Sequence, residues 1–365
     1  MKIMERIVLG RTVYLVLAVV GLLVLGAVYT IFGTEADFTP GPESASPGES
    51  DTPSGSIDPI REPDYAYETD VITFGGSCTA GSMLGSAAYG TFNGTLEENG
   101  AGYFFENLAD IFDSDGFTLV GLDSTFTDRE LTPAEKEERE WFTAPSSAAE
   151  IFSLGGVDAL ALEFSHTRDY GSDGYADTVL ALEAAGIQWG DSGKAVYHEL
   201  DSGVKIAVYC NQLKADRAEN IRNWIDGAQE KADFVVLYLT DSGESRDPGE
   251  EKTSLMRSFI DAGADLVVGT NGAVLQPAEY YGGGYIACSL GSLIDGGSRY
   301  NEEHTALLQV ELRSRDGELT DAQFRMIPCS TADGEQSWKP TPITDADDCE
   351  SVLAFLQGDQ PRPEN

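Results

Sequence analysis

The sequence is poor in histidine and in positive charge. Its 365 residues include 3 His, and 23 Lys and Arg stand against 62 Asp and Glu, which gives a formal net charge of −39. Because phosphate contacts need clustered basic side chains, nucleic-acid binding is excluded and docking on an anionic lipid surface is disfavoured. The hydrophobic content of 41% and the aromatic content of 10% are those of a folded protein rather than an acidic disordered one.

Familiar catalytic motifs are also missing. The sequence contains no H-E-x-x-H, no G-x-S-x-G and no C-x-x-C. Cys78, Cys210 and Cys288 lie in or beside apolar runs and are expected to be small buried residues. Cys329 and Cys349 lie in loop-rich sequence, and if any two cysteines form a disulfide we expect this pair.

One long apolar run stands near the N-terminus. Residues 12–33 carry no charge, and as a helix they would span about 33 Å, enough to cross a bilayer. Basic residues precede the run and acidic ones follow it, so the positive-inside rule places residues 1–11 in the cytoplasm and the rest outside. A cleaved signal peptide is the alternative, but the run does not end in a small-x-small site. We expect a single-pass anchor in the cell membrane.

The chain beyond the anchor falls into three parts. Residues 34–69 hold six of the 15 prolines and are rich in Ser, Gly and acids, which is typical of an extended linker. Residues 70–335 read as one folded domain, and residues 336–365 as a short helix and a polar tail. Asp201–Gly203 lies between two alternating runs and predicts a hairpin turn.

Apolar runs and amphipathic stretches alternate through the folded part, which predicts an α/β fold with buried sheets. The expected strands are Val71–Phe74, Phe117–Val120, Val157–Leu162, Val204–Cys210, Phe234–Leu239, Leu266–Gly269, Tyr285–Leu290 and Ala306–Leu312. The expected helices are Tyr103–Phe112, Ala134–Trp141, Tyr175–Ala185, Lys214–Glu230 and Glu251–Ala262.

Two loops are candidates for function. The glycine-rich segment Gly75–Gly81 follows a predicted strand and is either an anion-binding turn or an ordinary strand-end turn. His166 follows another strand, at the position where the active sites of α/β proteins lie. The alternative for His166 is a loop histidine paired with Asp169.

The order of several segments resembles the CapA-type capsule-synthesis proteins, a family linked to poly-γ-glutamate synthesis and built on a metallophosphatase-like fold. The resemblance covers about residues 70–330. Its segments are T-F-G-G-S-C-T (73–79), V-G-L-D (120–123), F-S-H-T-R-D-Y-G (164–171), A-G-A-D-L-V-V-G (262–269) and S-L-G-S (289–292). The implied fold is a layered sandwich in which helices flank β-sheets.

The resemblance also implies divalent metal ligands at the strand ends, and most of these are replaced. Ser77 stands for an Asp, Gly121 for an Asn, Asp123 for a Glu, Phe164-Ser165 for two Asn and Asn271-Gly272-Ala273 for H-P-H, while no His lies near Asp241. Only His166 and Asp123 remain as good ligands, which is too few for a two-metal site. We therefore expect no metal or other cofactor.

The predicted function is that of a membrane-anchored, non-catalytic CapA-like protein in the synthesis, export or attachment of an envelope polymer. The expected cleft consists of Gly76, Ser77, Asp123, Ser165, His166, Asp241 and Asn271. Its partners would be the membrane and polymer-synthesis or export proteins, because so acidic a domain repels a polyanion.

Two other functions stay open. In a metal-dependent hydrolase with a remodelled site, His166 would be a base or ligand, Asp123 and Asp241 would be the carboxylates, and Ser77 would be a nucleophile or oxyanion neighbour. The remaining possibility is an extracellular ligand-binding domain that uses the same cleft.

Overall fold

Two β-sheets lie face to face at the centre of the fold. The computed structural model describes residues 67–86, 91–135, 140–241, 245–271, 274–297, 304–334 and 337–358. The first sheet has the order β17-β16-β15-β1-β3-β6-β7, with β14 paired to β1, and the second has the order β12-β13-β11-β10-β9-β8. A small third sheet has the order β2-β5-β4.

The strands of the three sheets are β1 (Glu68–Thr79), β2 (Ser82–Met83), β3 (Phe117–Leu122), β4 (Thr125–Phe126), β5 (Phe142–Ala144), β6 (Ala159–Ala161), β7 (Gln188–Gly190), β8 (Val196–Glu199), β9 (Lys205–Gln212), β10 (Phe234–Asp241), β11 (Leu266–Asn271), β12 (Leu275–Tyr281), β13 (Gly284–Leu290), β14 (Ser292–Asp295), β15 (His304–Arg315), β16 (Glu318–Ser330) and β17 (Thr341–Pro342). The helices are α1 (Phe92–Asn99), α2 (Ala109–Phe112), α3 (Glu150–Leu154), α4 (Gly171–Ala184), α5 (Ala218–Ala228), α6 (Gly249–Asp261) and α7 (Ala346–Leu356), with short 3₁₀ helices η1 (Ala101–Tyr103), η2 (Glu106–Leu108), η3 (Ser146–Ala149), η4 (His166–Arg168) and η5 (Ala215–Arg217).

The continuous apolar runs of the sequence become the buried central strands. In β10 all residues except the last are buried, and the strand is parallel to both neighbours, β9 and β11. A strand covered on both faces needs apolar side chains at successive positions, and this is the pattern that predicted it. Each strand expected from the sequence is present, with ends shifted by a few residues.

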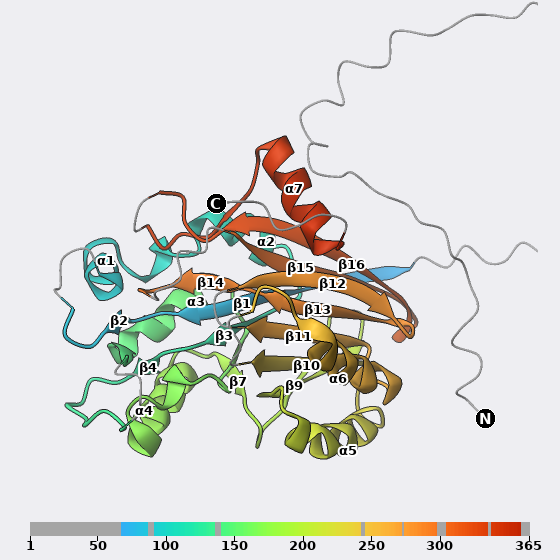
Figure 1. The fold of residues 1–365 in the computed structure, drawn as a ribbon, viewed down its shortest axis with the longest axis horizontal. Coiled ribbons are helices and arrows are strands. Elements are labelled where there is room, and N and C mark those ends of the chain that lie inside the picture. The colour runs from blue at the N-terminus through green and yellow to red at the C-terminus, as the bar shows by residue number, and fades with distance from the viewer. Residues whose placement is uncertain are drawn as a thin grey trace, which may run out of the picture. The chain divides into compact units, whose positions relative to one another are not determined.

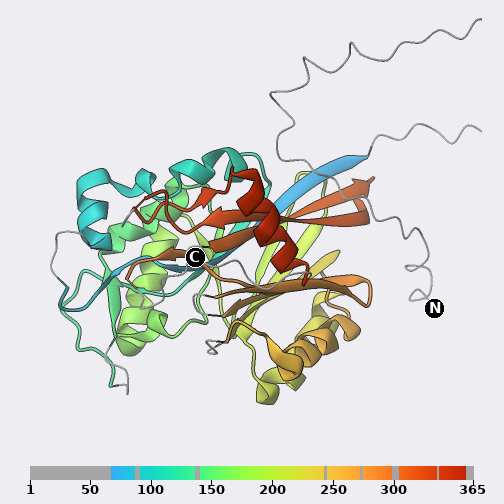
Figure 2. The same ribbon diagram turned by 45° about the horizontal axis from the view of Figure 1, so that its top comes forward.

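Three apolar cores separate four layers. One core lies between the two sheets and includes Phe74 of β1 and Val236 of β10. A second joins the outer face of the first sheet to α1, α2, α3 and α4, and a third joins the second sheet to α5 and α6. Helices α1 to α4 and helices α5 and α6 thus cover opposite outer faces of the sheet pair (Figures 1 and 2). The predicted layered α/β architecture is confirmed.

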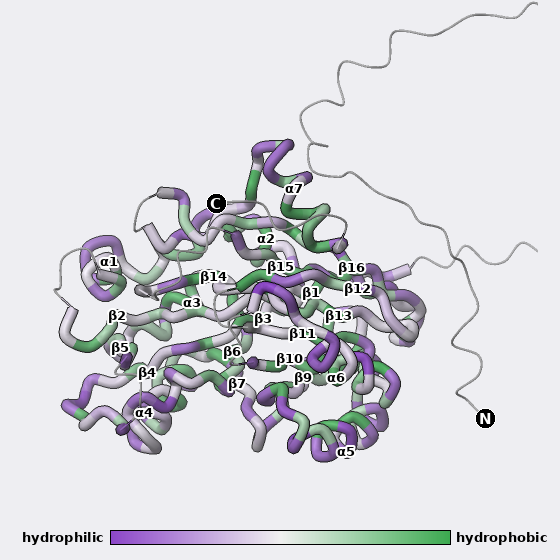
Figure 3. Tube along the Cα trace, viewed as in Figure 1, coloured by the Kyte–Doolittle hydropathy of each residue, from purple (hydrophilic) through white to green (hydrophobic). Residues whose placement is uncertain are grey.

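The spacing of apolar residues explains how the outer helices attach. In α5 the buried residues are Ala218, Ile221, Ile225 and Ala228, which lie on one helix face. Figure 3 shows the hydrophilic and hydrophobic positions alternating along this helix, whereas the central strands are mostly hydrophobic.

The predicted hairpin and the predicted C-terminal helix are both present. β8 and β9 are antiparallel, and Gly203 adopts a positive φ of 86° in the turn between them. At the start of α7 the Asp345 carboxylate accepts hydrogen bonds from the N–H groups of Asp347 and Asp348, as an N-cap does. Val352 of α7 packs into the core between the sheets.

Two helix predictions are wrong. The expected helix Tyr103–Phe112 is a series of short 3₁₀ and α turns, η1, η2 and α2, rather than one helix. Residues 134, 135, 140 and 141 of the other expected helix are not helical. There the Ala134 N–H donates to Asp169 O at 2.7 Å, so the backbone is bonded to a distant loop instead.

The predicted membrane anchor and linker, residues 12–33 and 34–69, lie outside the described residues except for the last few positions of the linker. Within the described part of the chain, no helix is both long and apolar enough to cross a bilayer.

Candidate functional site

The carboxyl ends of parallel strands from both sheets meet at one place. β1, β3 and β6 are parallel in the first sheet, as are β9, β10 and β11 in the second. The Tyr238 hydroxyl of β10 donates to Gly75 O of β1 at 2.9 Å, and the Thr240 hydroxyl donates to Glu163 O after β6 at 2.8 Å. These bonds tie the two sheets together at the ends where the predicted cleft residues lie.

The glycine-rich segment is part of β1 rather than a turn after it. β1 continues to Thr79, and its pairing with β3 changes register between Phe74 and Ser77. A Cβ on Gly76 would come within 2.0 Å of Gly291 O, so glycine is required by the close approach of another backbone. Residues 75–79 are therefore strand rather than a strand-end turn, and only Ala80 and Gly81 follow the strand.

Ser77 is buried beside a second serine. Its side chain lies at the carboxyl half of β1, where the two Oγ atoms of Ser77 and Ser292 are 3.3 Å apart. The Ser77 N–H donates to Gly291 O at 3.1 Å. A neutral hydroxyl in this setting supplies no charge for a divalent cation.

The Asp123 side chain is hydrogen-bonded to the backbone of His166. Asp123 follows β3 directly, and its Oδ1 accepts the His166 N–H at 2.8 Å. The His166 ring is held by Asp169, whose Oδ2 lies 2.9 Å from His166 Nδ1 and also accepts the Phe142 N–H at 2.6 Å. The Phe142 ring contacts the imidazole edge-on at 4.7 Å between centroids. The pairing of His166 with Asp169, given as the alternative above, is confirmed.

An aromatic ring occupies the space beside Gly121. A Cβ built on Gly121 would lie 2.4 Å from Phe164 Cζ and 3.0 Å from the Tyr238 hydroxyl oxygen. Phe164 is 7% exposed and belongs to the core between the sheets. The resemblance places asparagine ligands at both positions. Here Gly121 has no side chain, and the Phe164 ring occupies the space beside it.

Asp241 is neutralised from within the chain. It ends β10, and its Oδ2 lies 3.3 Å from the Lys252 ammonium of α6. Lys252 also donates to Gln276 Oε1 at 2.8 Å. Burial lowers the pKa of Lys252, and the Asp241 charge opposes that shift. Sequence reasoning missed Lys252, because a lysine in an acidic amphipathic helix is normally solvated.

The two remaining predicted cleft residues, Ser165 and Asn271, lie next to His166 and opposite Asp241. Ser165 precedes η4, and its carbonyl accepts the Arg168 N–H at 3.4 Å. Asn271 ends β11 and is the register partner of Asp241, although its side chain is outside what the structure describes. The structure thus brings Ser77, Asp123 and His166 to the ends of the first sheet, and Asp241 to the end of the second.

These residues do not fit a pair of divalent metal ions. Phe164 fills the room beside Gly121, Ser77 carries no charge, and Asp241 already has a cationic partner. Across the described segments, no three His, Cys, Asp or Glu side chains come close enough together to hold a metal ion.

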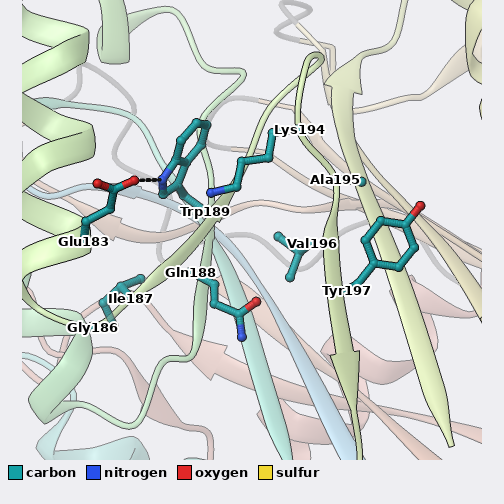
Figure 4. A pocket seen from close by; sticks show the side chains of 9 residues that line it. All are labelled: Glu183, Gly186, Ile187, Gln188, Trp189, Lys194, Ala195, Val196 and Tyr197. Carbon is teal, nitrogen blue, oxygen red and sulfur yellow. Dashed lines mark hydrogen bonds between the residues drawn. The ribbon is translucent and has the colours of Figure 1, made fainter.

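A cavity of about 480 Å³ lies away from the predicted cleft (Figure 4). It is bordered by the edge strands β7 and β8, and none of the predicted cleft residues lines it. Trp189 is central: the Lys194 ammonium is 3.7 Å from the centre of its ring, and its indole N–H donates to Glu183 Oε1 at 3.4 Å.

All five cysteines are buried and free. Burial is confirmed for Cys78, Cys210 and Cys288, whereas the disulfide expected between Cys329 and Cys349 is not formed in the structure. The Cys349 thiol is near enough for its charge to raise the pKa of Cys329, but the two sulfur atoms are not bonded.

Comparison with known proteins gives a consistent family. The family model described as "Bacterial capsule synthesis protein PGA_cap" matches residues 71–209 and 191–297, together more than half of the chain. The chain is 25% identical to the PGA biosynthesis protein CapA of Bacillus subtilis over 269 residues, which is 67% of this chain and 70% of the relative. It is 27% identical to the capsule biosynthesis protein CapA of Bacillus anthracis over 244 residues, 60% of this chain and 57% of that protein. Among solved structures, a novel phosphatase from Mycoplasma pneumoniae aligns with a TM-score of 0.42 and 9% identity, over 72% of this chain and 95% of the other.

Proposed function

The chain belongs to the bacterial capsule synthesis family PGA_cap, and from this premise we propose that it is a membrane-anchored, non-catalytic member of that family. Residues 12–33 would hold it in the cell membrane as a single pass, with the N-terminus in the cytoplasm and the folded domain outside. Its role would be to assist the synthesis, export or attachment of an envelope polymer of the poly-γ-glutamate type. No cofactor is needed for this role.

The observation that carries the non-catalytic assignment is the Phe164 ring packed against Gly121. The ring leaves no room beside Gly121 for a metal ligand, which supports a site without the metal-activated water that hydrolysis would need. The Asp241–Lys252 pair supports the same conclusion, because a carboxylate held by an ammonium is less able to bind a divalent ion.

The charge of the chain indicates which partner it would contact. A net charge of −39 opposes a direct grip on a polyanion, since like charges repel over the whole surface. We propose instead that the domain binds a protein of the polymer-synthesis or export machinery in the membrane. Nucleic acid is not a partner.

A hydrolase with a remodelled site is the second candidate, and one observation favours it. His166 is oriented by the carboxylate of Asp169, which is 1% exposed, and this is also how a general base is held. In that case His166 and Asp123 would be needed for activity, with a divalent metal as a possible co-reactant. The third candidate is a ligand-binding domain. The cavity beside Trp189 supports it, whereas the predicted cleft does not.

Complementation separates these functions. The gene is deleted in its own host, and the full chain is restored as wild type, Asp123→Asn or His166→Ala. Asp123→Asn is a matched change because the asparagine Oδ1 can still accept the His166 N–H. Glutamate released by acid hydrolysis of the washed envelope, in excess of that from the deletion strain, measures the polymer, and an immunoblot of the membrane fraction measures the protein.

We expect both variants to restore the polymer to the wild-type level. A variant without residues 1–33, exported by a cleavable signal, should be recovered in the medium and should not restore it. Loss of polymer in Asp123→Asn or His166→Ala at normal protein level would favour the hydrolase. A mature wild-type N-terminus near residue 34 would contradict the anchor.

A further inference from the structure

The two large sheets each end in an open strand edge beside the Trp189 cavity. β7 is the last strand of the first sheet and β8 the last strand of the second. The chain passes from one to the other through a short turn, which is closed by the bridge between Asp191 and Lys194. Among the described segments no further strand pairs with either of them, and the residues that line the cavity include members of both (Figure 4).

The register of the β8–β9 hairpin shows which main-chain groups of β8 point outward. The Leu200 N–H donates to Val204 O at 2.9 Å, so these two residues form a hydrogen-bonded pair. In an antiparallel ladder such pairs alternate with pairs that are not hydrogen-bonded, and the register places Tyr197 and Glu199 in the second kind. The N–H and C=O groups of Tyr197 and Glu199 therefore point away from β9, toward the open edge.

The main chain of Trp189 points outward from β7 for the same kind of reason. The Gln188 N–H donates to Asp158 O at 2.8 Å. Two residues later, Gly190 O accepts the Leu162 N–H at 2.9 Å. Because successive residues of a strand direct their hydrogen-bonding groups to opposite sides, Trp189 directs its own away from β6.

The surface beside these edges is apolar and partly exposed. Ile187 and Val196 contribute to the lining of the cavity, and Tyr197 is 43% exposed. Leu180 of α4 is 63% exposed and lies one helical turn before Glu183, another lining residue. Apolar side chains that remain exposed around a concave site are typical of an interaction surface.

We propose that the open edge of β8 binds an extended, basic segment of a partner protein as an added strand. Main-chain hydrogen bonds to Tyr197 and Glu199 supply the affinity, and an apolar side chain of the segment enters the cavity beside Trp189. A basic segment complements the net charge of −39, whereas a second copy of this chain is repelled by it. The inference rests on the protein partner proposed above and names the surface that binds it.

An edge that is only solvated is the competing explanation. β7 has three residues and β8 has four, and short edge strands are one way in which proteins avoid unwanted pairing. Under either explanation a basic peptide is attracted to so acidic a protein. The discriminating measurement is therefore whether binding depends on the main-chain N–H groups of the β8 edge.

The test selects a displayed library of random decapeptides on the full chain in detergent micelles, at an ionic strength that screens exposed charges. Enriched peptides are synthesised with a fluorophore, and fluorescence polarisation gives their Kd. Tyr197→Pro removes the outward N–H but keeps the bonds between β8 and β9, because proline is tolerated where a strand N–H faces solvent. Tyr197→Thr is the matched control, since it removes the ring and keeps the N–H. Thermal unfolding checks that each variant is folded.

The enriched peptides should alternate apolar with polar residues and contain an excess of Lys and Arg. Tyr197→Pro should weaken their binding about tenfold, and Tyr197→Thr clearly less. Trp189→Ala should also weaken binding, because the apolar side chain loses one wall of its cavity. N-methyl groups on one set of alternate peptide residues should abolish binding, whereas the other set should tolerate them. This last comparison leaves the protein unaltered and decides the matter if Tyr197→Pro does not fold.

Three results would overturn the inference. Equal binding to the wild type and Tyr197→Pro, or equal effects of the two N-methylated sets, would mean attraction to the acidic surface alone. A selection that enriches no peptide would mean that the edge is only solvated. The binding measurements do not involve the polymer, and complementation does, so a failure of one leaves the result of the other standing.

Discussion

The Phe164 ring and the Gly121 backbone are packed so closely that no side chain fits between them. A Cβ on Gly121 would lie 2.4 Å from Phe164 Cζ and 2.5 Å from Cε2. The two positions are on different strand ends, after β6 and within β3. The Phe164 ring therefore requires glycine at position 121, which leads to the first prediction.

Gly121→Ala should lower the free energy of unfolding by about 1–3 kcal/mol, because the new methyl group overpacks the core against Phe164. In a Phe164→Ala background the same substitution should cost clearly less, since the ring that blocks it is gone. Urea denaturation of the four combinations measures this coupling. Gly76→Ala is the matched control: its clash is with Gly291 O, so Phe164→Ala should not relieve it. Additive effects of Gly121→Ala and Phe164→Ala would contradict the packing described.

His166→Ala should lower stability modestly, by about 1–2 kcal/mol, because Asp169 loses one partner but keeps the Phe142 N–H. Asp169→Ala should cost more, about 2–4 kcal/mol, because it leaves both the Phe142 N–H and the imidazole without their acceptor. Thermal and urea unfolding of the two variants give the order. A larger loss for His166→Ala than for Asp169→Ala would show that the imidazole supports contacts beyond this pair.

Asp115 predicts a pH dependence of stability. Burial raises its pKa to about 6, hydrogen bonds from Thr73 and Thr118 lower it, and the charges of Asp158 and Asp113 raise it further. Because the folded pKa lies above the unfolded value, the protonated carboxyl favours the fold; this contribution is complete below about pH 4 and is lost as the pH rises through about 6. With a discount for partial solvent screening, the loss is about 1–2 kcal/mol.

Asp115→Asn should remove this slope and raise the Tm at pH 8 relative to the wild type. The amide oxygen can still accept the Thr118 hydroxyl, which bonds the carboxylate at 2.8 Å. Scans of Tm between pH 4 and pH 8 on both proteins make the comparison. If the two curves remain parallel, another group determines the slope.

The cysteines should be unreactive in the folded protein. Burial raises the pKa of Cys288 to about 11 and that of Cys329 to about 12, so little thiolate is present at neutral pH. With 5-thio-2-nitrobenzoate release as the measure, the native chain should react slowly, and the unfolded chain should release all five equivalents without reductant. Release of two fewer would show that the protein carries one disulfide, and mass mapping would then identify the pair.

The sequence by itself determined the elements whose causes are local. Buried parallel strands need continuous apolar runs, so β9, β10 and β11 were predictable from such runs in the sequence. The turn at Gly203 and the N-cap at Asp345 depend on neighbouring residues, and the His166–Asp169 pair spans a single 3₁₀ turn. The order of motifs was enough to identify the family.

Only the tertiary structure decided what the site contains. Ser77 meets Ser292 across 215 residues, and Phe164 reaches Gly121 from another strand. Lys252 of α6 is buried and paired with Asp241, although its sequence context is that of an exposed lysine. A residue's chemistry can be read from the sequence, whereas its partners depend on which strand ends the core packing brings together.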